Sequence, residues 1–207
     1  LNLNIYTDYF CLMDECEKFI QDVDYRKRIT QPIYEFFQFQ QKALVSATPL
    51  EMRHKELVNQ NFRILKIVPE YDYRKNLEVI VTNSYDKTVK SKLDDLQDSP
   101  CVCIFINSTN GINKIINTLK LTDYKVFCSN QSVKKLKERE FDNVYEMLEP
   151  LAKYNFFTCR FFSALDIKLK QKPDILILTD LNEAVYTMID PFTEAIQIQG
   201  RFRNGFN

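Results

Sequence analysis

Short apolar runs alternate with amphipathic or charged stretches along most of this sequence. The run C-V-C-I-F-I at residues 101–106 is typical of a strand buried on both faces, and residues 110–121 place Ile112, Ile115 and Ile116 on one helical face. Strands that alternate with helices predict the α/β class, in which helices cover both faces of a parallel sheet. The expected strands are residues 8–14, 42–46, 63–68, 77–82, 101–106, 124–128, 156–160 and 175–179, and the expected helices are residues 17–28, 31–40, 51–59, 86–96, 110–121, 133–139, 144–154 and 193–203.

The polar, tyrosine-rich stretch at residues 70–76 predicts a linker between two domains, residues 1–69 and residues 77–207. Of the 207 residues, 45% are apolar and 27% are charged, a composition that supports packed cores. The chain starts at Leu1 and enters a strand almost at once. This looks like a fragment that begins inside a fold, so we expect its open sheet edges either to associate with a second copy or to be covered by a front portion that precedes Leu1.

Charge and cysteine content exclude several classes of site. Lysine plus arginine and aspartate plus glutamate both number 28, so any electrostatic grip on nucleic acid has to be local. The six cysteines include no C-x-x-C pair, and His54 is the single histidine, which argues against zinc. These thiols suit a reducing cytoplasm, and the sequence contains neither a signal peptide nor an apolar run long enough to cross a membrane.

The stretch F-C-L-M-D-E-C-E at residues 10–17 carries the first candidate site. An apolar run that ends in paired acids predicts a buried strand that presents Asp14 and Glu15 at the edge of a sheet, where open α/β sheets bind ligands. A carboxylate such as that of Asp14 can hold Mg²⁺, which prefers oxygen ligands, while Glu15 can orient or deprotonate a water.

Three further motifs follow in order. Ser46-Ala47-Thr48-Pro49 comes directly after an expected strand, and Thr158 begins a segment that ends at Asp166. The last motif is Q-I-Q-G-R-F-R, at residues 197–203. Together with the Asp-Glu pair, the order and spacing of these motifs resemble motifs II, III, V and VI of superfamily-two helicases and nucleic-acid translocases. The resemblance covers nearly the whole chain.

The resemblance implies two RecA-like lobes, a partial first lobe followed by a complete second lobe, with ATP and Mg²⁺ between them. Asp14 would hold the metal and Glu15 would position the attacking water. An arginine on the γ-phosphate, Arg201 or Arg203, would stabilise charge in the transition state, an effect worth about 10³–10⁵ in rate in other NTPases. The other implied site residues are Gln197 as a catalytic residue, Asp166 and Gly200 at the nucleotide, and Ser46, Thr48 and Thr158 in coupling or nucleic-acid contact.

The implied partner is a single- or double-stranded nucleic acid, with DNA favoured over RNA, and no membrane. The sequence departs from the family pattern at four positions. Glu17 stands where motif II has Asp or His, Ser163 and Ala164 replace the arginine and glycine of motif V, and Asn204 replaces the last arginine of motif VI. Because the chain also lacks a glycine-rich G-K-S/T loop, we expect these 207 residues alone not to turn over ATP.

Two alternatives remain open. The altered motifs V and VI favour a catalytically silent RecA-like module that binds nucleic acid or protein. A G-K-S/T loop upstream of Leu1 would favour the ATPase, and its absence the silent module. The third interpretation is a metal-dependent hydrolase that uses Asp14 and Glu15, which requires a third acid at the same sheet edge. Asp180 is the nearest candidate, but it follows a strand of the other predicted lobe.

Overall fold

The computed structural model describes residues 4–21, 31–48, 54–68, 70, 75–163 and 165–207. The chain divides into two compact units, Leu1–Val79 and Ile80–Asn207, each described separately below. Parts of three expectations lie outside the described residues: residues 22–28 and 51–53 of two helices, and most of the 70–76 linker. So do Pro49 and Ala164.

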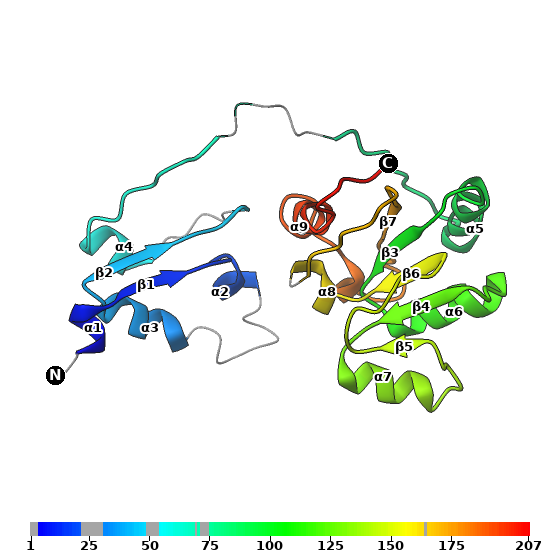
Figure 1. Cartoon of the computed structure of the whole chain (residues 1–207), viewed down its shortest axis with the longest axis horizontal. Helices are drawn as coiled ribbons and strands as arrows, with labels where there is room; N and C mark the ends of the chain where they lie inside the picture. The colour runs from blue at the N-terminus through cyan, green and yellow to red at the C-terminus, as the bar shows by residue number, and fades with distance from the viewer. Residues whose placement is uncertain (1–3, 22–30, 49–53, 69, 71–74, 164) are drawn as a thin grey trace. The chain divides into compact units, whose positions relative to one another are not determined.

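The first unit contains a two-stranded parallel sheet, β1 (Phe10–Met13) with β2 (Gln41–Leu44), drawn in blue and light blue in Figure 1. The register pairs Phe10 with Gln41 and Met13 with Leu44, so both strands end at the same edge. The helices of this unit are α1 (Ile5–Asp8), α2 (Lys18–Gln21), α3 (Gln31–Gln38) and α4 (Lys55–Asn59).

The second unit is built on a five-stranded parallel sheet in the order β5-β4-β6-β3-β7 (Figure 1). Parallel neighbours require crossover connections, and the helices between the strands supply them. The strands are β3 (Val102–Ile106), β4 (Tyr124–Phe127), β5 (Val144–Tyr145), β6 (Tyr154–Phe157) and β7 (Asp174–Leu178). The helices are α5 (Tyr85–Asp95), α6 (Thr109–Leu119), α7 (Asn130–Lys137), α8 (Arg160–Ser163) and α9 (Glu194–Gly200), with a 3₁₀ turn at Val185–Thr187.

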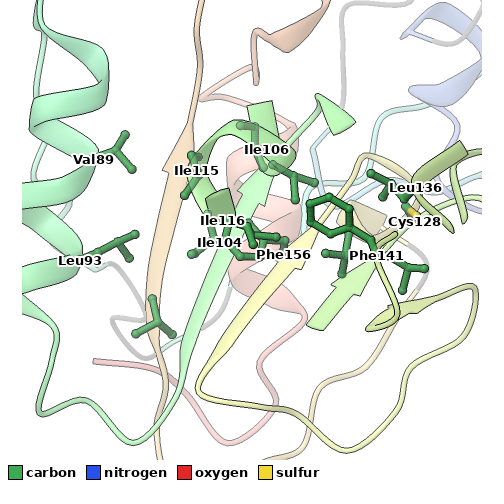
Figure 2. Packing of buried hydrophobic residues seen from close by; sticks show 14 residues of the cluster. Val89, Leu93, Ile104, Ile106, Ile115, Ile116, Cys128, Leu136, Phe141 and Phe156 are labelled. Carbon is green, nitrogen blue, oxygen red and sulfur yellow. The ribbon is translucent and has the colours of Figure 1, made fainter. Parts of the chain in front are cut away.

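Successive side chains of the strands point to opposite faces of this sheet, and each face has its own core. On one face, Ile104 and Phe156 pack with residues of α5, α6 and α7, among them Leu93, Ile116 and Leu136 (Figure 2). The other core consists of Cys103, Phe105, Phe127, Phe157, Phe161, Phe162, Ile167, Ile189, Ala195, Ile198 and Phe202, which include residues of α8 and α9. The predicted α/β class, with a parallel sheet and helices on both faces, is therefore confirmed for this unit.

Three predicted elements are wrong. Residues 63–68 and 77–82 form no strand, and their apolar side chains are exposed, with Ile64 at 99% and Val81 at 94%. An isolated extended segment gains no ladder hydrogen bonds, and no described segment pairs with either stretch. Residues 144–154 are not helical, because the edge of β4 recruits Val144 and Tyr145 as the short strand β5.

Within the described part of the chain, every helix is too short or too polar to cross a bilayer.

Candidate functional site

Asp14 and Glu15 follow the last residue of β1, at the strand end that the sequence predicts. The expectation that this strand is buried is wrong, because Phe10 and Leu12 are 58% and 59% exposed. The Asp14 side chain is exposed, and its Oδ1 accepts the backbone N–H of Glu15 at 2.8 Å. Glu15 has a φ of 50°, in the left-handed region that side chains with a Cβ seldom adopt. Such strained positions gather at functional sites, and here the turn redirects the chain immediately after the strand.

The two strands of the first unit continue to bond beyond their formal ends. The N–H of Val45 donates to the carbonyl of Met13 at 2.9 Å, and the N–H of Cys16 donates to the carbonyl of Val45 at 3.1 Å. These bonds hold the segment after β1 against the segment after β2. Residues 14–17 and 46–48 therefore lie side by side at the carboxyl edge of the sheet.

Glu17 links these two segments through its side chain, which is only 1% exposed. The hydroxyl of Ser46 donates to Glu17 Oε2, and the hydroxyl of Thr48 lies 3.5 Å from Glu17 Oε1. Ser46 Oγ also accepts the backbone N–H of Thr48 at 3.0 Å. A buried carboxylate needs such hydrogen bonds to offset its desolvation, so the three residues form one network.

The motif pattern identifies Glu17 only as a departure and does not predict it as a site residue. The available signal was the pairing of the two strand ends, because that pairing places residue 17 opposite residues 46–48.

Burial and the neighbouring carboxylates of Glu17 and Asp14 raise the pKa of the Cys16 thiol, which keeps it protonated. A protonated thiol is a weaker nucleophile than a thiolate, so Cys16 is a weak candidate for attacking a substrate.

In the second unit, Thr158 follows β6 and is 7% exposed. Its N–H donates to the carbonyl of Phe127 at 3.1 Å, and its hydroxyl lies 3.4 Å from the same oxygen. Thr158 thus extends the β4–β6 ladder. The contacts seen here tie its hydroxyl to the backbone of the neighbouring strand.

Asp166 and Arg203 form an exposed ion pair, with Nη2 of the arginine 2.7 Å and Nε 2.9 Å from Asp166 Oδ1. The hydrogen bonds from Arg203, helped by the charges of Arg203, Arg201 and Lys168, hold the pKa of the Asp166 carboxyl below its usual range. Asp166 ends the segment that begins at Thr158, and Arg203 ends the segment at residues 197–203. Their segments meet through backbone bonds between Ile167 and residues 201 and 203.

Gln197, Gly200 and Arg201 lie on or directly after α9. Gln197 is 5% exposed, and its carbonyl accepts Nε of Arg201 at 3.0 Å. Nη1 of Arg201 donates to the carbonyl of Ser163 at 2.5 Å, which connects α9 to the end of α8. A Cβ added at Gly200 would meet no atom within 4 Å, so local packing does not require glycine there.

A polar contact that the sequence analysis did not single out occupies the carboxyl edge of β3 and β7. Ser108, the N-cap of α6, donates to Glu183 Oε1 at 2.6 Å and accepts the N–H of Gly111 at 2.9 Å. The signal in the sequence was the S-T-N-G run after the most apolar strand, which is typical of a helix start. The contact secures the loop after β7 to α6.

The structure thus brings Asp14, Glu15, Ser46 and Thr48 to one sheet edge in the first unit. In the second unit it pairs Asp166 with Arg203. Asp180, the third acid of the hydrolase interpretation, follows β7 in the other unit's sheet. In the described ranges, no three His, Cys, Asp or Glu side chains are grouped so that they could hold a metal ion.

Comparison of the chain with family models, curated proteins and solved structures gave no match.

Proposed function

We propose that this chain is part of an ATP-dependent nucleic-acid helicase or translocase, with the first unit contributing motifs II and III of one RecA-like lobe and the second unit forming the other lobe. The reaction is hydrolysis of ATP by an activated water, coupled to movement on a nucleic-acid strand. The four motifs and their order support this proposal, as does their position at strand and helix ends.

The network of Glu17, Ser46 and Thr48 is the observation that carries the proposal. It joins the segment that bears Asp14 and Glu15 to the segment after β2. A change in the position of the Asp-Glu turn would therefore move residues 46–48 as well. A coupled element of this kind is what a motor needs between its hydrolytic acids and its strand-binding surface.

The residues present fit the metal and nucleotide chemistry. Asp14 offers an exposed carboxylate, the ligand type that Mg²⁺ takes together with waters. Glu15 is the candidate for orienting or deprotonating the attacking water. The nucleotide, when bound, supplies the phosphoanhydride bond that is broken. Arg201 and Arg203 are the cations of the proposed motif VI. Gln197 and Gly200, the other residues proposed there, belong to α9.

The test is nucleic-acid-stimulated ATP hydrolysis by the longest natural chain that carries this sequence. Glu15→Gln should reduce the turnover number by about 10²–10⁴, the usual contribution of a general base. Glu35→Gln, an exposed acid in α3, is the matched control and should leave turnover unchanged. Equal turnover in wild type and Glu15→Gln would remove that carboxylate from the mechanism and refute the proposal.

A catalytically silent nucleic-acid- or protein-binding module is the second candidate, and the arginine contacts favour it. Arg201 is bonded to two carbonyls of its own unit, and Arg203 is paired with Asp166. A silent module would bind single-stranded nucleic acid or a protein without hydrolysing ATP in any length of chain. The same turnover assay separates the two candidates.

A further inference from the structure

Two cysteines lie together at the amino end of β3, in the apolar run at residues 101–106. Cys101 and Cys103 are two residues apart and therefore point to the same face of the sheet. Their Sγ atoms are 4.0 Å apart. Cys103 is fully buried, whereas Cys101 is partly exposed, so one thiol of the pair can be reached from solvent and the other cannot.

The Cys101 side chain packs against the core that contains Cys103 and Phe105, but its sulfur also meets polar groups. Nδ2 of Asn155 lies 3.4 Å from it, and this buried amide is itself fixed by Ala152, whose N–H donates to Oδ1 at 2.9 Å and whose carbonyl accepts Nδ2 at 2.7 Å. The S–H of Cys103 and the Lys153 ammonium add to the stabilisation of a thiolate, while burial and the Asp174 carboxylate oppose it. On balance the pKa of Cys101 is lowered.

Three other thiols provide a contrast. The hydrogen bond to Cys101, together with burial, raises the pKa of Cys103 well above its usual value. Burial raises the pKa of Cys128 to about 11, and burial also raises that of Cys16. Reactive cysteines sit in polar or electropositive, partly exposed positions, and Cys101 has that environment.

We propose that Cys101 and Cys103 form a peroxide-reactive dithiol, with Cys101 as the attacking sulfur and Cys103 as the resolving one. The Cys101 thiolate attacks the terminal oxygen of a hydroperoxide, forming an S–O bond and breaking the O–O bond, and the alkoxide or hydroxide leaves and takes up a proton. The Cys103 sulfur then attacks the sulfenic sulfur. This forms the S–S bond, breaks the S–O bond and releases water, which carries away the thiol proton. The dithiol loses two electrons, and the peroxide gains them.

The second step requires the two sulfurs to approach from 4.0 Å to about 2.05 Å, the length of a disulfide. Cys101 precedes β3, which begins at Val102, but its carbonyl still accepts the N–H of Asp174 at 3.0 Å. The Cys101 end of the strand therefore has to shift for the disulfide to close. The first step needs no such movement, because Cys101 is accessible where it stands.

The test treats the full chain with hydrogen peroxide at neutral pH, then traps sulfenic acid with dimedone and maps the modified peptides by mass spectrometry. Cys101 should react several-fold faster than the exposed Cys159, which serves as the internal reference. Wild-type protein should accumulate a Cys101–Cys103 disulfide. Cys103→Ala should instead accumulate the dimedone adduct at Cys101, and Cys159→Ser should behave as wild type.

Two results would overturn the proposal. One is peroxide modification of Cys159 at a rate equal to or above that of Cys101 in wild-type protein, a measurement that needs no variant. The other is a Cys101 adduct yield that is the same with and without Cys103 in variants whose circular dichroism matches wild type. Neither result bears on ATP turnover, because both thiols lie at the amino end of β3.

Discussion

Replacing Ser46 by alanine tests whether the Glu17 network joins the two strand ends of the first unit. The substitution removes the hydrogen bond to the Glu17 carboxylate, worth about 1.5–3 kcal/mol, and the neutral bond from the Thr48 N–H, worth about 0.5–1.5 kcal/mol. The sum is about 2–4.5 kcal/mol. Ser46 is only partly buried, so water recovers some of the loss, and we expect the lower end of this range.

Native-state hydrogen exchange is the appropriate assay, because the loss is local and the chain has two units, so a single unfolding free energy is not defined. The reporters are the amides of Cys16 and Val45, which bridge the strand ends. A loss of about 2 kcal/mol should accelerate their exchange by about 30-fold. Ser129→Ala, which removes the N-cap of α7, should affect amides of the second unit only.

The reasoning fails if Ser46→Ala leaves exchange at the Cys16 and Val45 amides within a factor of two or so of wild type. A double-mutant cycle with Glu17→Gln sharpens the result. Residues that share a network should show a coupling energy of about 0.5–3 kcal/mol, whereas independent sites add to within about 0.5 kcal/mol. Additive effects would mean that Ser46 and Glu17 stabilise the strand ends independently and that the hydrogen bond between them adds no stability of its own.

Gly111→Ala should lower the urea midpoint of the second unit, because the new Cβ would lie 2.9 Å from a neighbouring side chain. Gly200→Ala should raise that midpoint, because its Cβ would lie in open space and leaving glycine gains about 0.5–1 kcal/mol. The raised Cys128 pKa should keep that thiol unalkylated by iodoacetamide below about pH 9, and its stabilising contribution should be lost as pH rises from 9.0 towards about 11. Exposed Ile64 and Ile67 should cause concentration-dependent self-association in sedimentation velocity, and changing both to glutamate should abolish it.

Continuous apolar runs were the most predictable part of the fold. The run at residues 101–106 matched β3 to within one residue at each end, and every residue of β3 is buried, as expected for a strand covered on both faces. The run at residues 175–179 matched β7 to the same precision, although β7 is an edge strand and is only partly buried. The helix at residues 110–121 was equally clear, because its apolar residues recur at helical spacing and Ser108 caps it.

Short or unpaired segments were not predictable in the same way. Residues 63–68 and 77–82 have strand-like composition, but a strand exists only where another backbone accepts its hydrogen bonds. The two residues of β5 carry no periodic signal at all, and the edge of β4 determines them. Glu17 presents the same difficulty at the site, since its burial depends on a contact with Ser46, 29 positions away.

The contacts of Arg201 are compatible with both the catalytic and the silent interpretation, and a substitution at this residue can separate the two. A guanidinium has five N–H donors, and the contacts to the Gln197 and Ser163 carbonyls use two of them. Arg201 can therefore keep its tie between α8 and α9 and still offer donors to a phosphate. Lysine retains the charge but cannot make both contacts in the same fork geometry. In a catalytic chain, Arg201→Lys should lower both ATP turnover and the stability of the second unit. In a silent module, the substitution should change stability alone, so the pair of measurements separates a structural arginine from a catalytic one.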